Sequence, residues 1–421
     1  MKNIKQWGAP MAAFVILMCR HSLLAQDWPQ WRGANRDGRT SAFAAPSTWP
    51  TNLALKWRVN VGKGDATPAL VGSNLYVFTR QGTAEVLQCL DAGSGQTQWK
   101  ASYPANFVVG GPAVGHPGPR SSPAVAGGKI CTLGIGGILS CFDAASGLLL
   151  WRKQSTNDYL GVPYKSDSSM SPIVEEGRCI VHVGVKTNGA IISFDLCSGD
   201  PKWIWSGDGP ANSSPVTMTA GGKKQLVTLT ASKLVSLDLA DGKVLWQFPF
   251  EASQGNNTTP VVAGTMVICT GQGKGLVAVK IEPQGKDFSA TPLWTTAQLG
   301  TRFTTPVLKD GLLYGYNGRL FCVDAQTGAP LWNEAAELGQ TASLVDAGPV
   351  IFALGGHGDL LVFQPGSSYA QLARIKVADS ETWAHPVVAH DRIFIKESDE
   401  VELWSIEQPP PGLASPESLP R

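Results

Sequence analysis

The feature that most constrains the fold is a ten-residue phrase that recurs along the chain. Each copy has an Asp, a Gly four residues later and a Trp eight residues after the Asp; the five copies are LDAGSGQTQW, FDAASGLLLW, FDLCSGDPKW, LDLADGKVLW and VDAQTGAPLW. Their Asp and Trp residues are Asp91 and Trp99, Asp143 and Trp151, Asp195 and Trp203, Asp238 and Trp246, and Asp324 and Trp332. Repetition with a period of about 20–50 residues is typical of solenoids and propellers.

A second recurring element precedes each copy of the phrase. It is a Ser/Thr–Pro step followed by small β-forming residues, as in TPALV, SSPAV, SPIV, SSPV, TTPVV, TTPVL and, with His in place of Ser or Thr, HPVV. A weaker version, ASLV from Ala342 to Val345, has no Pro. Pro suits the start of a strand, where no ladder donor is needed, and Asp with a following Gly suits a hairpin turn. Each unit therefore predicts four short strands, with the Trp on the outermost.

The number of units follows from the Trp-bearing outer strands. They occur at Trp57, Trp99, Trp151, Trp203, Trp246, Trp294 and Trp332, with a degenerate eighth strand at LARIKV, residues 372–377. Four strands in roughly 40–50 residues indicate propeller blades. The first outer strand, LKWRV, has no unit before it, and the last unit, RIFIKESDEVELWSI, has no outer strand after it. We therefore predict an all-β, eight-bladed β-propeller of four-stranded antiparallel blades, closed by the N-terminal strand; seven blades is the alternative if the unit at 342–377 is misread.

The segments outside the blades have different compositions. Residues 1–25 have the basic start, apolar middle and small-residue end of a signal peptide. The apolar run is about half of what a bilayer span needs, although an uncleaved anchor and lipidation of Cys19 are alternatives. We assign residues 26–52 to an N-terminal extension, 53–407 to the propeller and 408–421 to a disordered Pro-rich tail.

Charge and cysteine content narrow the class of function. Removal of residues 1–25 takes away three basic residues and leaves 31 basic against 33 acidic residues, a net charge of −2. Without a Lys/Arg run, the chain has no footprint for nucleic acid or an anionic membrane. Seven cysteines then remain, an odd number without a C-x-x-C motif, which argues against a disulfide framework. We expect an exported monomer of the periplasm or cell envelope, or a secreted one, with no transmembrane span after cleavage.

The phrase and the Ser/Thr–Pro step together resemble a known family. The pattern D-A-x-S/T-G-x-x-x-W is similar to the repeat of the pyrroloquinoline quinone (PQQ)-like propellers, in the quinoprotein alcohol dehydrogenase-like superfamily, over roughly residues 50–407. That superfamily contains eight-bladed dehydrogenases that use PQQ and calcium. It also contains a BamB-like non-enzymatic branch, with a periplasmic scaffold of outer-membrane β-barrel assembly. The start DWPQWRG is similar to exported PQQ-like repeat proteins.

The resemblance implies tests for enzyme chemistry. Quinoprotein dehydrogenases usually place two adjacent cysteines against the cofactor, and this sequence has no Cys-Cys pair. They also need Glu, Asn and Asp side chains on a divalent cation, with a carboxylate as base, and no such set stands out. We therefore predict no catalytic residues, no metal site and no cofactor. A PQQ- and calcium-dependent dehydrogenase that oxidises alcohols or sugars is the alternative.

Function is then expected where the blades differ. We interpret the repeated Asp residues as turn caps rather than ligands, and the repeated Trp residues as packing between blades. The loops that precede the first strands converge on one face of a propeller, and five of their residues are candidates for binding a ligand or partner: Arg120, Asn212, Asn256, Arg302 and His385. We predict a non-catalytic protein-interaction scaffold or ligand-binding module whose partners are envelope proteins or peptides, with glycans as a further class.

Overall fold

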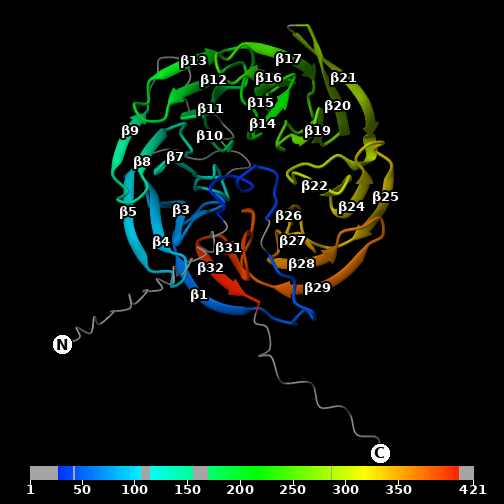
Figure 1. Cartoon of the computed structure of the whole chain (residues 1–421). Helices are drawn as coiled ribbons and strands as arrows, with labels where there is room; N and C mark the ends of the chain where they lie inside the picture. The colour runs from blue at the N-terminus through cyan, green and yellow to red at the C-terminus, as the bar shows by residue number, and fades with distance from the viewer. Residues whose placement is uncertain (1–26, 41–42, 106–113, 155–168, 286, 407–421) are drawn as a thin grey trace, which may run out of the picture.

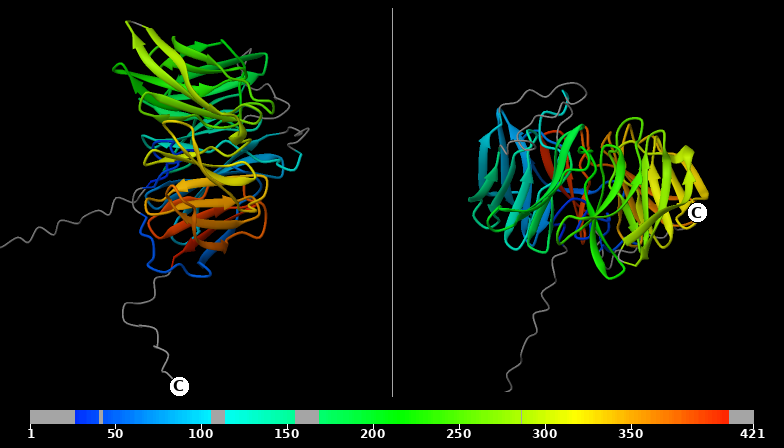
Figure 2. Two further views of the ribbon diagram at one scale, coloured as in Figure 1. Left: turned by 90° about the vertical axis from the view of Figure 1, so that its right-hand side faces the viewer. Right: turned by 90° about the horizontal axis from the view of Figure 1, so that it is seen from above.

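The computed structural model describes residues 27–40, 43–105, 114–154, 169–285 and 287–406. Within these residues the strands form eight four-stranded antiparallel sheets, which stand as blades around a central channel (Figure 1). Figure 2 shows the same ring edge-on in two views. The prediction of an eight-bladed all-β propeller is confirmed. The predicted signal peptide, Cys19 and the predicted tail lie outside the described residues. In the described part, no helix is long and apolar enough to cross a bilayer.

In blades 1 to 7 the strands run in chain order from the channel to the rim. The strands of the first four blades are β2 (Ala69–Val71), β3 (Asn74–Gln81), β4 (Ala84–Asp91) and β5 (Thr97–Pro104); β6 (Ala124–Ala126), β7 (Lys129–Leu133), β8 (Leu139–Asp143) and β9 (Leu149–Lys153); β10 (Ile173–Glu175), β11 (Arg178–Val185), β12 (Asn188–Asp195) and β13 (Pro201–Trp205); and β14 (Val216–Ala220), β15 (Lys223–Leu229), β16 (Lys233–Asp238) and β17 (Val244–Pro249).

Blades 5 to 8 repeat the pattern, with a short 3-10 turn, η2 (Ala297–Leu299), after blade 5. Their strands are β18 (Val261–Ala263), β19 (Met266–Gly271), β20 (Gly275–Gln284) and β21 (Asp287–Thr296); β22 (Val307–Lys309), β23 (Leu312–Tyr316), β24 (Arg319–Asp324) and β25 (Pro330–Ala335); β26 (Ala342–Asp346), β27 (Ile351–Gly355), β28 (Asp359–Gln364) and β29 (Ala370–Lys376); and β30 (Val387–Ala389), β31 (Arg392–Lys396), β32 (Glu400–Ser405) and β1 (Ala54–Asn60).

The ring closes as the sequence predicts. Strand β1 is the fourth strand of blade 8 and pairs antiparallel with β32, with Trp57 opposite Leu403 and Arg58 opposite Glu402. The weak unit that begins at Ala342 forms a complete blade 7 despite its missing Pro. Because the first and last parts of the chain share one sheet, no sheet edge is left open at the junction of the termini.

The recurring phrase links neighbouring blades wherever one copy follows another in adjacent blades. In blade 2 the Asp143 carboxylate accepts hydrogen bonds from the Ser146 amide (2.9 Å) and hydroxyl (2.6 Å), which fixes the turn between β8 and β9. The Trp151 indole then reaches blade 3, where Nε1 donates to the Leu196 carbonyl at 3.0 Å. There it also lies over Gly199, the Gly of the next copy of the phrase. The Trp of one copy therefore packs on the turn of the following copy.

Blade 5 lacks the phrase, and the Trp of the blade before it makes a different contact. Its third and fourth strands, β20 and β21, form a long hairpin instead of the Asp–Gly turn. The preceding Trp246 donates Nε1 to Gln225 Oε1 of its own blade at 2.8 Å. Blade 7 also lacks the phrase, yet Trp332 Nε1 of blade 6 donates to its Gly366 carbonyl at 3.1 Å, so a Trp can reach the next blade without an Asp–Gly turn there.

The Ser/Thr–Pro steps form a second set of links, around the channel. Backbone amides at these steps donate to hydroxyls of the adjacent blade: Thr67 to Ser122 (3.1 Å), Ser122 to Ser171 (2.9 Å), Ser171 to Ser214 (2.9 Å), Thr259 to Thr305 (3.0 Å), Ala342 to Thr304 (3.3 Å) and His385 to Thr67 (2.9 Å). We call this series the hydroxyl belt. We call the side of the ring on which it lies the proline face, and the opposite side, with the Asp–Gly turns, the turn face.

The N-terminal extension occupies the channel, where Figure 1 shows its dark blue trace. It begins at the turn face, where Asp27 Oδ1 accepts the amide of Gly72 (2.8 Å). Trp28 then pairs with Leu70 through two backbone hydrogen bonds of 2.8 and 2.9 Å. The segment returns to the turn face, where the Thr40 amide donates to the Asp346 carbonyl (2.9 Å). Residues 27–40 thus enter and leave the channel through the same face.

The cysteines lie as the repeat implies. Cys89, Cys141 and Cys322, which occupy the same position in their blades, are fully buried. All seven cysteines of the described part are free thiols, and Cys197 alone among them is exposed. The six buried cysteines behave as small core residues, and the seven form no disulfide framework within the described residues.

Candidate functional site on the proline face

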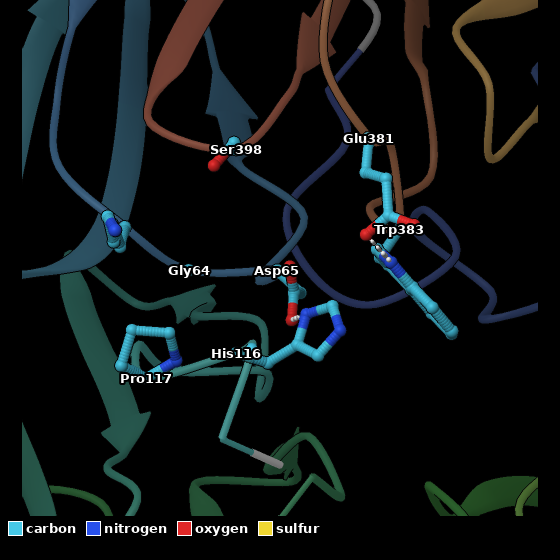
Figure 3. Close-up of a pocket in the computed structure, with 9 residues that line it drawn as sticks. Gly64, Asp65, His116, Pro117, Glu381, Trp383 and Ser398 are labelled. Atoms are coloured by element: carbon cyan, nitrogen blue, oxygen red, sulfur yellow. Dashed lines mark hydrogen bonds and ion pairs between the residues drawn. The ribbon is translucent and has the colours of Figure 1, made fainter. Parts of the chain in front are cut away.

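Loops of blades 1, 2 and 8 form a small pocket on the proline face. It has a volume of about 50 Å³, and its polar and aromatic lining comes from Lys63, Asp65, His116, Glu381, Trp383 and Ser398 (Figure 3). Pockets for free small molecules are typically about 300–1,000 Å³. A cavity of this size suits one side chain of a larger partner better than a whole substrate.

A histidine–aspartate pair forms the polar wall of the pocket. His116 Nδ1 lies 2.9 Å from Asp65 Oδ2, and both side chains are largely covered. The hydrogen bond to Asp65 raises the pKa of His116 above its ordinary value of 6.5, while partial burial and nearby Arg120 oppose the shift. The pair can therefore carry a positive imidazole beside the Asp65 carboxylate in mildly acidic solution.

Aromatic rings continue from this pair across the mouth of the channel. Trp383 lies edge-on to His116, with ring centroids 5.1 Å apart, and edge-on to Phe303 at 5.5 Å. Phe303 comes from the loop before β22 of blade 6, and the Arg302 guanidinium carbon lies 4.7 Å from its ring centroid. We call Phe303, Trp383 and His116 the aromatic bridge. It joins loops of blades 6, 8 and 2.

Two of the five sequence candidates flank this bridge. Arg302 is exposed beside Phe303. Arg120 is partly buried and donates to the His116 carbonyl at 3.1 Å, so it supports the loop that carries the imidazole. The structure thus brings Arg120 and Arg302 to opposite sides of one surface.

His385 lies deeper, at the hydroxyl belt. It is only 4% exposed, and its ring meets Trp31 of the N-terminal extension edge-on at 4.6 Å. Burial lowers its pKa well below the ordinary value, so the imidazole is neutral. In this position His385 contacts the chain's own extension rather than the surface.

The two asparagine candidates lie between blades 4 and 5, away from the pocket. Asn256 is buried; its Nδ2 donates to the Thr230 (2.7 Å) and Phe250 (2.8 Å) carbonyls, and its Oδ1 accepts the Ala252 amide (3.0 Å). Its polar atoms are therefore used in holding the loop. Asn212 is partly exposed and donates to Asn257 Oδ1 at 3.0 Å.

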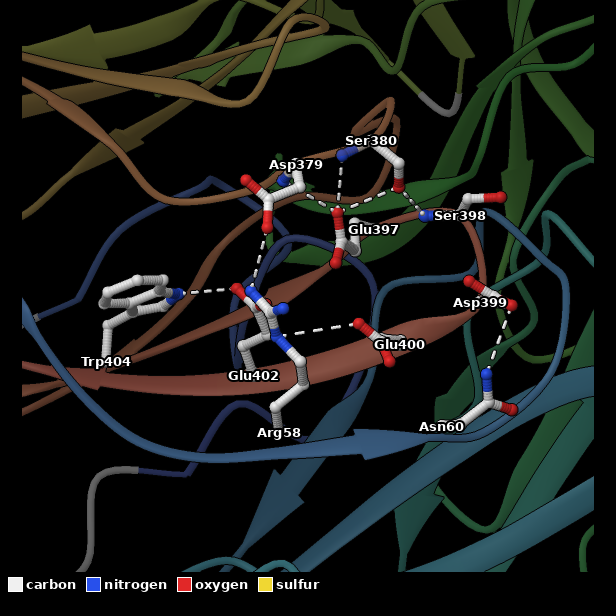
Figure 4. Close-up of polar contacts among 10 residues, drawn as sticks. All are labelled: Arg58, Asn60, Asp379, Ser380, Glu397, Ser398, Asp399, Glu400, Glu402 and Trp404. Carbon is white, nitrogen blue, oxygen red and sulfur yellow. Dashed lines mark hydrogen bonds and ion pairs between the residues drawn. The ribbon is translucent and has the colours of Figure 1, made fainter.

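A group of carboxylates lies beside the closing strand (Figure 4). Glu397, Glu400 and Glu402 place one oxygen each within 4.8 Å of the others, a spacing that could hold a cation. The Arg58 guanidinium from β1 already lies 2.5 Å from Glu402 Oε1 and 3.6 Å from Glu400 Oε2. Glu397 Oε2 accepts the amides of Asp379 and Ser380. Glu400 and Glu402 are thus paired with the Arg58 cation, and Glu397 is hydrogen-bonded to backbone amides. We call these residues the closing clamp and assign no metal to them.

Reasoning from the sequence missed the aromatic bridge and the pocket. Asp65 lies in a loop before a first strand, the kind of loop from which the candidates were chosen, but His116, Trp383 and Phe303 carry no motif. Their loops are far apart in the chain and meet only because the ring brings blades 6, 8, 1 and 2 to a common axis. The aromatic residues just before the TTP and HP steps were the available signal.

Comparisons with known proteins agree with this architecture. The family model described as outer membrane protein assembly factor BamB matches residues 82–334, well over half of the chain. The outer membrane protein assembly factor BamB of Shewanella oneidensis is 23% identical over 351 residues, which cover 72% of this chain and 86% of that protein.

Solved structures show the same fold. BamB from Moraxella catarrhalis superposes with a TM-score of 0.62 at 14% identity, covering 84% of this chain and 97% of that one. Quinohemoprotein alcohol dehydrogenase from Comamonas testosteroni superposes with a TM-score of 0.64 at 14% identity, covering 93% and 82%. At these identities the structures show the fold alone and do not separate a scaffold from an enzyme. The family match goes further: the chain belongs to the family of outer membrane protein assembly factor BamB.

Proposed function

We propose that this protein is an exported, non-catalytic scaffold of the cell envelope that binds a protein partner, in a role related to outer membrane protein assembly. The observation that carries the proposal is that the chain's own N-terminal extension occupies the channel. Residues 27–40 fill it from the turn face to the hydroxyl belt, and the fully buried charged groups of this segment are the guanidinium groups of Arg32 and Arg36. With the channel occupied, the proline face is the surface that we assign to the partner, because its loops differ from blade to blade.

The filled channel argues against the PQQ and calcium alternative. Calcium needs a set of carboxylate and carbonyl oxygens, whereas Arg32 and Arg36 are 1% and 3% exposed inside the ring. Burial lowers the pKa of Arg32 to about 10 and that of Arg36 to about 9, so both remain charged at neutral pH. Two buried guanidinium groups would repel a divalent cation, and their carbonyl partners are already bound. The residues present therefore do not fit a calcium ion in the channel.

The proline face has the chemistry of a protein interface. Aromatic residues and Arg are enriched where partners bind most strongly, and here Arg302, Phe303 and Trp383 lie together beside charged Asp65 and Glu381. The pocket next to them accepts one side chain. This arrangement supports contact with a peptide or protein surface rather than turnover of a free substrate.

Capture from the native envelope tests the proposal. The purified mature protein should retain a reproducible envelope partner, and Trp383→Ala should weaken retention by about thirtyfold or more, because hot-spot truncations cost about 2 kcal/mol or more. Leu148→Ala is the matched control, since Leu148 is 68% exposed on the turn face. Equal loss with both variants would contradict the assignment of the surface. In parallel, PQQ and Ca²⁺ should change neither the melting temperature nor the absorbance, and tight binding with dye-linked alcohol oxidation would contradict the scaffold.

A further inference from the structure

The contacts of residues 27–40 with the blades resemble those of a peptide in a binding site. The Trp28 backbone pairs with β2 of blade 1, and the Pro29 carbonyl accepts the amide of Val125 in blade 2 at 2.8 Å. On the returning side, the Thr40 hydroxyl donates to the Val388 carbonyl of blade 8 at 3.1 Å. Backbone groups of the first strands thus supply most of the recognition.

Two arginines of the segment make equivalent contacts with two blades. Arg32 donates to the carbonyls of Thr305 (3.0 Å) and Pro306 (2.8 Å) in blade 6. Arg36 donates to the carbonyls of Ser171 (3.0 Å) and Pro172 (2.9 Å) in blade 3. In both cases the guanidinium binds the Ser/Thr–Pro step just before a first strand. Charge-assisted bonds of this kind are roughly twice as strong as neutral ones.

The local backbone gives the segment its shape. Arg32 and Arg36 have φ values of 61° and 58°, and Gly33 and Gly38 lie at 83° and 76°. These left-handed residues fold the segment into a compact loop, and its two long side chains reach blades three positions apart in the ring. Trp31 adds a third contact, since its Nε1 donates to Thr259 Oγ1 of blade 5 at 2.9 Å.

We propose that the central channel is a peptide-binding site, that residues 27–40 of this chain are its ligand, and that the site recognises the pattern W-R-x-x-x-R. The segment enters and leaves through the turn face, so it can dissociate and return without opening the ring. The proposal is independent of the partner on the proline face.

The test uses the full mature chain with a protease recognition sequence inserted between Ser47 and Thr48, which are exposed in the connection to β1. After cleavage, gel filtration and native mass spectrometry should find the N-terminal fragment still with the folded ring. A labelled synthetic peptide of residues 27–43 should then exchange into the channel. The same peptide with Arg32→Met and Arg36→Met should compete at least about tenfold less well. Because the substitutions are in the peptide, the ring stays native in both arms.

Four results would overturn the proposal. A fragment that elutes free of a folded ring would show that only the covalent connection holds it. Equal competition by both peptides would remove the arginines from recognition. A fragment that excess native peptide cannot displace after days of warming would be part of one cooperative fold rather than a ligand. A dimer in which the segments have swapped would assign the site to a second copy.

Discussion

Gly199→Ala tests the contact by which one blade locks on the next. Gly199 is the Gly of the third copy of the phrase and has a φ of 72°. A Cβ added there would lie 2.7 Å from Trp151 Cδ2 and 2.8 Å from Cγ. Carbon atoms in normal contact are about 3.5–4.0 Å apart, so the indole would have to move by roughly 1 Å.

Two costs contribute to the expected loss of stability. A residue with a Cβ in the left-handed region costs about 1–2 kcal/mol. Overpacking a well-filled contact costs about 1–3 kcal/mol more. The shift would also disturb the 3.0 Å hydrogen bond from Trp151 Nε1 to Leu196. We therefore expect Gly199→Ala to lower the free energy of unfolding by about 2–5 kcal/mol.

Gly177→Ala is the matched control, because it separates backbone strain from the contact. Gly177 lies in the same blade with a φ of 71°, and nothing lies within 4 Å of its added Cβ. Urea unfolding followed by circular dichroism and Trp fluorescence should give a loss of only about 1–2 kcal/mol for it. Trp151→Leu should offset part of the loss in the Gly199→Ala protein, as a double-mutant cycle would show. Equal losses for the two glycine variants would refute the interlocking of Trp and Gly.

Two further variants test the pocket and the ring closure. Asp65→Asn should lower the pKa of His116, and an NMR titration of the imidazole would measure the change. An unchanged pKa would mean that Asp65 does not stabilise the protonated imidazole. Because folding raises this pKa from 6.5, the pair stabilises the fold below about pH 6.5 and the contribution is lost as pH rises through the raised value. Arg58→Met should destabilise the protein by about 1–2 kcal/mol, since it leaves the fully buried Glu402 without its cation. If urea unfolding shows no change in stability, the closing clamp is not stabilising.

The sequence was sufficient for the architecture because the signals were local and repeated. Asp143 and Gly147 fix a turn within five residues, and Trp151 follows at a constant distance, so the five copies of the phrase reveal the repeat and the outer strands give the number of blades. Even blade 7 could be placed, since its strands keep their apolar pattern without the Pro. The hydroxyls of the Ser/Thr–Pro steps were quoted as part of the pattern, but their role in the belt depends on the adjacent blade.

The candidate site could be predicted only in part, because its contacts join loops that are distant in the chain. The candidates were chosen from loops where the blades differ. Two of them, Arg120 and Arg302, flank the aromatic bridge, whereas Asn256 supports its own loop. His385 was a candidate for binding a ligand or partner, and the structure places it against Trp31 of the chain's own extension. No repeat pattern could show that residues 27–40 turn back into the channel.

Site-specific crosslinking in the native envelope tests most directly whether the proline face binds the partner. A photoreactive residue in place of the exposed Arg302 would report contacts of that face, and one in place of Leu148 would report contacts of the turn face. We predict that position 302 gives a discrete crosslinked product with an envelope protein and that position 148 does not. A product from position 148 alone, or from neither position in a protein that binds PQQ and oxidises alcohols, would contradict the account.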